Sequence, residues 1–173
     1  MASGNPVIQI MLTNNLAEAR IGDPVPLETR VAQLLSRMTL AEKIGQMSQF
    51  SGGAGDLHQA IKDGRAGSVI NEVDVEKVNY LQRLAVEESR LGIPLLIGRD
   101  VIHGFKTIFP IPLGQAASWN PEVLTEGARI SALEASAAGV NWTFAPMIDV
   151  TRDPRWGRIA ESPGEDPYLV GKI

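Results

Sequence analysis

Charged side chains crowd the segment from Val150 to Glu161, which reads VTRDPRWGRIAE. It contains three arginines, two acids, a tryptophan and a glycine, and it follows an apolar stretch at 141–149 that indicates a buried strand. Parallel strands of α/β proteins present active-site groups at their carboxyl ends. Guanidinium groups beside carboxylates and an indole suit a ligand with many hydroxyl groups. An Arg–Asp network that only holds a long loop in place fits the same composition.

The alternating signs in this segment predict that most of its charged groups pair with one another, leaving one or two to face a ligand. The competing groups are Asp149, Arg152, Asp153, Arg155, Arg158 and Glu161. Trp156 has the surface to stack on a sugar ring, although packing is the more common role of a tryptophan. Trp119 and Trp142 are predicted to lie in the core.

A second group, Asp100-Val-Ile-His103-Gly104, follows a predicted strand at 93–97. An aspartate at the carboxyl end of such a strand is well placed to accept hydrogen bonds from two neighbouring hydroxyl groups. The alternatives for Asp100 are a helix cap or a partner for Arg99. His103 suits either acid–base chemistry or a structural hydrogen bond. The adjacent Gly104 indicates a tight turn and favours the structural role.

The elements that would position these groups alternate along the chain. Apolar spacing, capping residues and glycines predict helices at 27–38, 39–47, 74–90 and 120–138, and a helix beginning near 165; strands are predicted at 67–70, 93–97 and 140–150. Repeated βαβ units predict an α/β fold with parallel strands. A closed (β/α)8 barrel takes about 250 residues, so the chain is predicted to form the first half of such a barrel, with about three βα units. A small doubly wound sheet is the alternative, but the first βα turn lacks a G-x-G-x-x-G fingerprint.

Composition excludes several classes of function. A net charge of −4 and a pI near 5.2 argue against nucleic acid or an anionic membrane as a partner. The chain has no cysteine, and with only two histidines, His58 and His103, a metal site is not expected. Residues 1–23 lack a signal-peptide pattern. Two prolines in the stretch at 22–26 favour an extended backbone, so we predict an N-terminal tail or linker at 1–26. An incomplete barrel domain is predicted at 27–173.

Seven ordered motifs resemble the N-terminal part of glycoside hydrolase family 3, and within it the bacterial β-glucosidases. They are TLAEKIGQM (39–47), GRDVIHG (98–104), TIFPIPLG (107–114), AASW (116–119), FAPMIDV (144–150), RDPRWGR (152–158) and GEDPYL (164–169). The resemblance covers about residues 27–173. It implies a (β/α)8-type barrel followed by an α/β sandwich domain, and hydrolysis of terminal non-reducing β-D-glucosyl residues with retention, through a covalent glycosyl–aspartate intermediate.

The resemblance also implies roles for particular residues. Asp100 and Arg158 match the family's substrate-binding aspartate and arginine, and nothing comparable implies a catalytic role for His103. The family's lysine–histidine pair, its nucleophile and its acid/base glutamate come later in the sequence. We therefore expect no catalytic residue within these 173 residues and no activity from them alone. Neither Asp149 nor Asp153 is assigned as a replacement, because nearby cations keep such acids ionised and a retaining glycosidase needs one acid with a raised pKa.

The expected partners are a β-glucoside or oligosaccharide substrate and the remaining parts of the barrel and second domain. No cofactor is expected. A non-catalytic half-barrel that assembles with itself or with a complementary chain stays open as an alternative, since an unfinished sheet needs a partner. So does a β-xylosidase or β-N-acetylhexosaminidase relative. The resemblance suggests a periplasmic or secreted location.

Overall fold

The computed structural model describes residues 25–173. The predicted N-terminal tail, with its missing signal pattern, therefore lies almost entirely outside the described residues. The chain divides into two compact units, residues 1–97 and 98–173, and the boundary falls inside a strand. The two are described separately below as unit 1 and unit 2.

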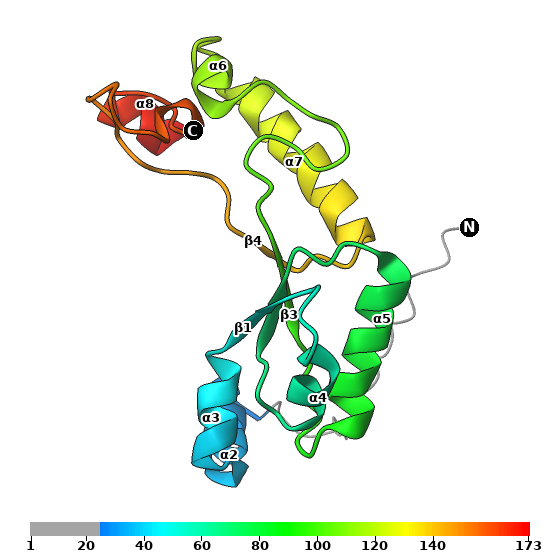
Figure 1. The fold of residues 1–173 in the computed structure, drawn as a ribbon. Helices are drawn as coiled ribbons and strands as arrows, with labels where there is room; N and C mark the ends of the chain where they lie inside the picture. The colour runs from blue at the N-terminus through cyan, green and yellow to red at the C-terminus, as the bar shows by residue number, and fades with distance from the viewer. Residues whose placement is uncertain (1–24) are drawn as a thin grey trace. The chain divides into compact units, whose positions relative to one another are not determined.

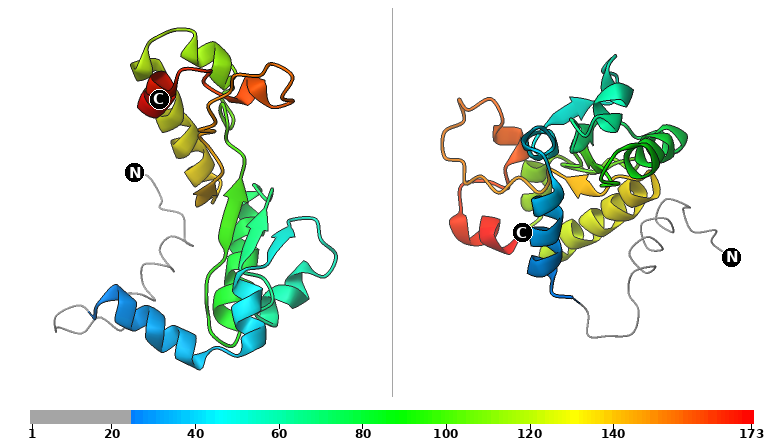
Figure 2. Two further views of the ribbon diagram at one scale, coloured as in Figure 1. Left: turned by 90° about the vertical axis from the view of Figure 1, so that its left-hand side faces the viewer. Right: turned by 90° about the horizontal axis from the view of Figure 1, so that it is seen from below.

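Unit 1 alternates helices with short strands (Figure 1). Its elements are α2 (Leu27–Arg37), α3 (Leu40–Gln46), β1 (Gln49–Ser51), α4 (Leu57–Lys62), β2 (Ser68–Ile70), α5 (Val75–Arg83), a π-helical turn η1 (Leu84–Glu88) and the start of β3 (Leu96–Arg99). Helix α2 buries none of its side chains, and Figure 2 shows it extending away from the strands of this unit.

Unit 2 contains the end of β3 and the elements that follow it. These are α6 (Pro112–Ala116), α7 (Pro121–Ala137), β4 (Trp142–Thr143), a short 3-10 helix η2 (Ile159–Glu161) and α8 (Pro167–Lys172). A long loop, orange in Figures 1 and 2, leads from β4 to α8. This loop carries the arginine-rich segment.

The strands form one sheet in the order β1-β2-β3-β4. Strand β1 is parallel to β2 and β3 is parallel to β4. Consecutive strands joined by helical segments are the βαβ arrangement that the sequence predicts, and the α/β fold class is confirmed. The sequence predicts three strands, and the three-residue strand β1 is an additional one.

Local signals placed several helix ends correctly. Thr39 and Glu42 form the predicted capping box at the start of α3. Asn120 caps α7 by accepting a hydrogen bond from the Glu122 amide at 3.1 Å, and the helix ends just before Gly139. Helices α4 and α6 were not predicted.

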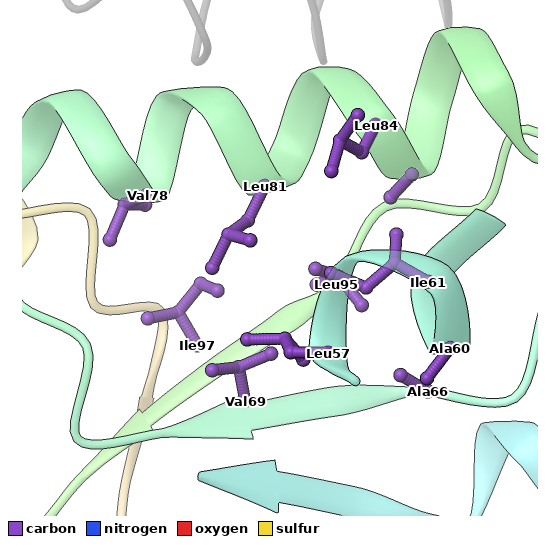
Figure 3. Packing of buried hydrophobic residues seen from close by; sticks show 11 residues of the cluster. Leu57, Ala60, Ile61, Ala66, Val69, Val78, Leu81, Leu84, Leu95 and Ile97 are labelled. Atoms are coloured by element: carbon purple, nitrogen blue, oxygen red, sulfur yellow. The ribbon is translucent and has the colours of Figure 1, made fainter. Parts of the chain in front are cut away.

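The core of unit 1 is a cluster of eleven buried apolar side chains (Figure 3). Leu57 and Ile61 of α4, Val69 of β2, Leu81 of α5 and Ile97 of β3 are each at most 2% exposed. They come from four elements and meet on one side of the sheet strands, as Figure 3 shows. Burying a side chain of this size contributes about 1.5–3 kcal/mol, so this cluster is the main source of stability in unit 1.

Arg90, which follows η1, makes a salt bridge and hydrogen bonds with residues at the end of α2 and in α3. The Arg90 guanidinium donates to both oxygens of Glu42, at 2.8 and 2.6 Å, and to the Arg37 carbonyl at 2.9 Å. The Thr39 amide and hydroxyl also donate to Glu42. Mainly because of the hydrogen bond from Arg90, the pKa of Glu42 falls from 4.5 to about 2. The carboxylate is therefore ionised throughout the neutral range.

Two glycines allow backbone segments of unit 1 to touch. A Cβ at Gly45 would lie 2.0 Å from the Gly64 carbonyl oxygen, and a Cβ at Gly67 would lie 2.2 Å from the Gln46 carbonyl oxygen. Both obstacles are backbone atoms that cannot rotate away. The end of α3 can therefore approach the segment before β2 only because both positions lack a side chain.

Unit 2 has a much smaller buried apolar cluster, made of Val101, Ala135 and Val140, with Phe105 packed against it. Beside it lies a cavity of about 430 Å³, lined mostly by apolar or small residues of α7 and of the loops after β3 and β4. Apolar packing alone therefore organises little of this unit.

Three predictions for unit 2 were wrong. Trp119 and Trp142 are 72% and 38% exposed instead of buried. Trp119 lies in the turn before α7, and Trp142 covers the ring of Phe144 in an edge-on contact at 4.7 Å. The third predicted strand, 140–150, contains only the two residues of β4. Pro146, which has no amide hydrogen to donate to a neighbouring strand, follows shortly after them.

Candidate functional site

Asp100 follows the last residue of β3 directly and is exposed. Strand β3 is parallel to β4, with Arg99 in register with Thr143. Beyond this pair, the Phe144 amide donates to the Arg99 carbonyl at 3.3 Å. The chain leaving β3 and the chain leaving β4 therefore start from the same edge of the sheet, where the sequence placed its two groups of candidate residues.

The loop after Asp100 is held by hydrogen bonds. His103 contacts the Phe109 carbonyl through Nδ1 at 2.9 Å, and the Phe109 amide donates to the His103 carbonyl at 2.8 Å. Glu134 of α7 accepts from the amides of Lys106 and Thr107, both at 2.8 Å, and from the Thr107 hydroxyl at 2.7 Å. These bonds, led by those from Thr107, hold the pKa of Glu134 below its usual range. His103 has the structural role favoured by the sequence, whereas the anchoring role of Glu134 was not predicted.

The charged groups of the loop after β4 form two short-range pairs. Arg155 donates to Asp153, with its closest contact at 2.6 Å, and Arg158 donates to Glu161 through Nε at 3.0 Å and Nη2 at 2.6 Å. Each arginine lowers the pKa of its acid through these hydrogen bonds. The alternation of signs predicted such pairing, but it could not show which residues would be partners.

Charged residues from both candidate groups act on Arg158. Its pKa is raised first by the hydrogen bond to Glu161 and then by the negative charges of Asp149 and Asp100. The charge of Asp100 is the weakest of these influences on Arg158, and it acts although the two residues are far apart in the sequence. A carboxylate that accepts and a guanidinium that donates, both at one sheet edge, can bind several hydroxyl groups of one ligand.

A second hollow lies on the same loop. It measures about 260 Å³ and is lined by Asp149, Val150, Thr151, Arg152, Asp153 and Trp156. Trp156 is 37% exposed, so part of its indole is accessible at this hollow. The larger apolar cavity of unit 2 includes His103 in its lining but neither Asp100 nor Arg158.

Two kinds of feature were not found in the part of the chain that the structure describes. Within residues 25–173, no three His, Cys, Asp or Glu side chains gather in a way that could hold a metal ion. Over the same residues, no helix has the length and apolar character needed to cross a membrane.

Comparison with known proteins shows which family this chain resembles. The family profile described as "Glycosyl hydrolase family 3 N terminal domain" matches residues 39–173. The periplasmic β-glucosidase of Salmonella typhimurium is 41% identical over 98% of this chain, which spans 23% of that protein. The periplasmic β-glucosidase/β-xylosidase of Dickeya chrysanthemi is 36% identical over 86% of the chain, which spans 28% of it.

Solved structures show the same relationship. The β-glucosidase of Listeria innocua in complex with glucose is 42% identical and superimposes with a TM-score of 0.76, over 85% of this chain and 23% of the Listeria chain. The fold is thus that of the first part of the barrel domain, as the sequence predicted. Since the family profile covers most of the chain, from the capping box of α3 to α8, the protein belongs to glycosyl hydrolase family 3 and matches its N-terminal domain.

Proposed function

We propose that these residues form part of the sugar-binding site of a β-glucosidase that removes terminal non-reducing β-D-glucosyl residues with retention. Asp100 accepts hydrogen bonds from sugar hydroxyl groups, and Arg158 donates to them. The observation that carries the proposal is the parallel pairing of β3 and β4, which starts the Asp100 segment and the loop of Arg158 at the same sheet edge, with the charge of Asp100 acting on Arg158. Family membership and the sugar complex of the Listeria relative support it.

The role of this site is to orient the sugar, and the bond-breaking groups belong to other parts of the enzyme. A retaining glycosidase needs a carboxylate nucleophile and a protonated acid with a raised pKa. In this loop Asp153 and Glu161 have lowered pKa values because arginines donate to them. They remain ionised near neutrality and are unsuited to donate a proton. The 173 residues span about a quarter of the relatives' length, and alone they are proposed to hydrolyse no β-glucoside.

The test compares Asp100→Ala and Arg158→Ala in a catalytically competent protein that contains these residues. Each substitution removes a group that fixes the sugar, and we expect kcat/KM for an aryl β-glucoside to fall by at least about 10²-fold. Arg129→Ala is the matched control, since Arg129 also pairs with an acid three positions away, at 2.6 Å, but lies on α7. Near-normal kcat/KM in Asp100→Ala or Arg158→Ala contradicts the proposal, as does hydrolysis by the 173 residues alone.

Sugar preference is tested in the same assay. The relatives of this chain include a protein named as a β-glucosidase/β-xylosidase, which is 36% identical, and one named as a β-xylosidase, which is 30% identical. A glucoside-to-xyloside ratio of kcat/KM well above one supports glucosidase activity, and the opposite ratio assigns the protein to the xylosidases. An aryl β-N-acetylglucosaminide serves as the third substrate.

We also propose that further barrel segments cover the apolar cavity of unit 2. A separate proposal is that the protein is periplasmic or secreted, since two relatives are named as periplasmic. Sedimentation of the 173 residues separates the first idea from self-association. A monomer at all concentrations argues against a self-assembling half-barrel, whereas concentration-dependent dimers support it. Cell fractionation of the native host tests the location.

A further inference from the structure

Ser162 is fully buried and lies at the base of the loop that carries Arg158. Its hydroxyl accepts from the Thr151 hydroxyl at 2.8 Å and from the Gly164 amide at 3.0 Å, and it donates to the Asp149 carbonyl at 2.6 Å. The Thr151 amide also donates to the Gly164 carbonyl at 3.0 Å. The Ser162 hydroxyl and this backbone hydrogen bond together join the two ends of the loop. Removing the hydroxyl would break its partly buried hydrogen bonds, each of which contributes about 0.5–1.5 kcal/mol.

The residue before this serine is the partner of Arg158. Glu161 ends the short helix η2, and the Ser162 amide donates to the Ile159 carbonyl at 3.1 Å, closing that turn. The Glu161 amide donates to the Arg158 carbonyl at 3.0 Å. The backbone of Glu161 is therefore fixed by Ser162 on one side and by η2 on the other, which sets the position from which its carboxylate contacts Arg158.

The contact uses one edge of the guanidinium group. Both Nε and Nη2 of Arg158 donate to the same oxygen of Glu161, and Nη2 also lies 3.8 Å from the Met147 sulfur. Among the described residues, no group accepts a hydrogen bond from Nη1. The two hydrogens of Nη1 are therefore available to a ligand, while the opposite edge is held.

Without Glu161, the guanidinium has other acids nearby. Asp149 and Asp100 both act on Arg158 through their charge. Without the hydrogen bonds to Glu161, these two charges would be the remaining acidic influences on the guanidinium group.

We propose that Glu161 is the positioning residue for Arg158 and that the buried hydroxyl of Ser162 sets the position of Glu161. The assignment rests on the proposed function, in which Arg158 binds the sugar. It adds two residues that act on the sugar only through Arg158, one by holding its guanidinium group and one by closing the loop.

The first experiment follows the Nε–Hε signal of Arg158 in a nitrogen–proton correlation spectrum of the 173-residue chain, assigned by its loss in Arg158→Lys. Glu161→Gln and Ser162→Ala are expected to shift or broaden this signal. Glu126→Gln is the matched control, since Glu126 accepts from Nε and Nη2 of Arg129 at 2.7 and 2.6 Å, three positions away on α7. It should change the Arg129 signal and leave that of Arg158 unaltered. An unchanged Arg158 signal in Glu161→Gln overturns the assignment.

The second experiment measures kcat/KM for an aryl β-glucoside in the catalytically competent protein. Glu161→Gln is expected to lower kcat/KM by up to about 10²-fold, with the thermal midpoint close to that of Glu126→Gln. In the Arg158→Ala background the same change should add almost nothing, because residues that act through one group are not additive. Full additivity would mean that Glu161 acts independently of Arg158.

These outcomes separate the two proposals. If Arg158→Ala leaves kcat/KM near normal, the proposed function fails. If Arg158→Ala is strongly impaired while Glu161→Gln is normal, the sugar-binding role of Arg158 stands and the positioning role of Glu161 is wrong.

Discussion

In unit 1 eleven buried apolar side chains from helices and strands pack into one cluster, whereas in unit 2 the corresponding cluster has three residues. Unit 2 instead relies on single polar groups that each bind several partners: Glu134 for the loop after β3 and Ser162 for the loop after β4. Apolar burial is non-directional, while hydrogen bonds fix particular atoms. The unit that carries the candidate site is thus the one whose loops are held at defined points.

The largest expected effect lies in the core of unit 1. Leu81→Ala, at a side chain only 2% exposed, should lower the free energy of unfolding by about 2–5 kcal/mol, because it removes buried methyl groups and leaves a cavity. Leu40→Ala is the matched control at a side chain that is 74% exposed, and it should change stability by no more than about 0.5 kcal/mol. Urea denaturation measures both. Equal effects would show that this cluster does not dominate unit 1.

A smaller, pH-dependent effect is expected at Glu42, the polar exception in unit 1. Its pKa is lowered to about 2 in the folded state, mainly by Arg90, so its contribution is present above the unfolded value of 4.5 and is lost as the pH falls toward 2. Glu42→Gln should therefore be less stable than the parent at neutral pH. The difference should shrink between pH 4.5 and 2. A difference that stays constant over this range in urea midpoints would contradict the role of the charge.

The smallest effect concerns the start of α7 in unit 2. Asn120→Ala removes the side chain that accepts from the Glu122 amide and should cost about 1 kcal/mol. Asn120→Asp, which keeps an accepting oxygen, should restore most of this loss. Thermal unfolding followed by circular dichroism compares the three proteins. A full loss in Asn120→Asp would exclude capping as the cause.

Local signals made much of the helical structure predictable. The Thr39–Glu42 capping box and the limits of α7 at Asn120 and Gly139 depend on neighbouring residues only. Helix α4 was not predicted although Leu57, Ala60 and Ile61 have helical spacing, because its six residues give only a short repeat. Strand β1 has no comparable signal, since a three-residue strand depends on its pairing with β2.

For the candidate site, the sequence indicates the segments but not the contacts that their residues make. Asp100 and Arg158 were identified through family resemblance, and their sugar-binding role remains a prediction. The choice of Glu161 as the partner of Arg158 depends on the turn of η2, which alternating charges do not specify. Ser162 could not be distinguished from other loop serines, because its burial arises only when the loop closes. Trp119 and Trp142 are predicted to lie in the core but are exposed, since residue type alone does not determine exposure.

The contact made through Gly45 and Gly67 has a consequence for how this protein can diverge. Elsewhere in unit 1 a packing position accepts several apolar residues of similar volume. A Cβ atom would lie 2.0 Å from a carbonyl oxygen at Gly45 and 2.2 Å from one at Gly67. Only glycine is therefore tolerated at these two positions. This corner of the fold can therefore change over evolution only by displacing its backbone, and not by gradual exchange of side chains.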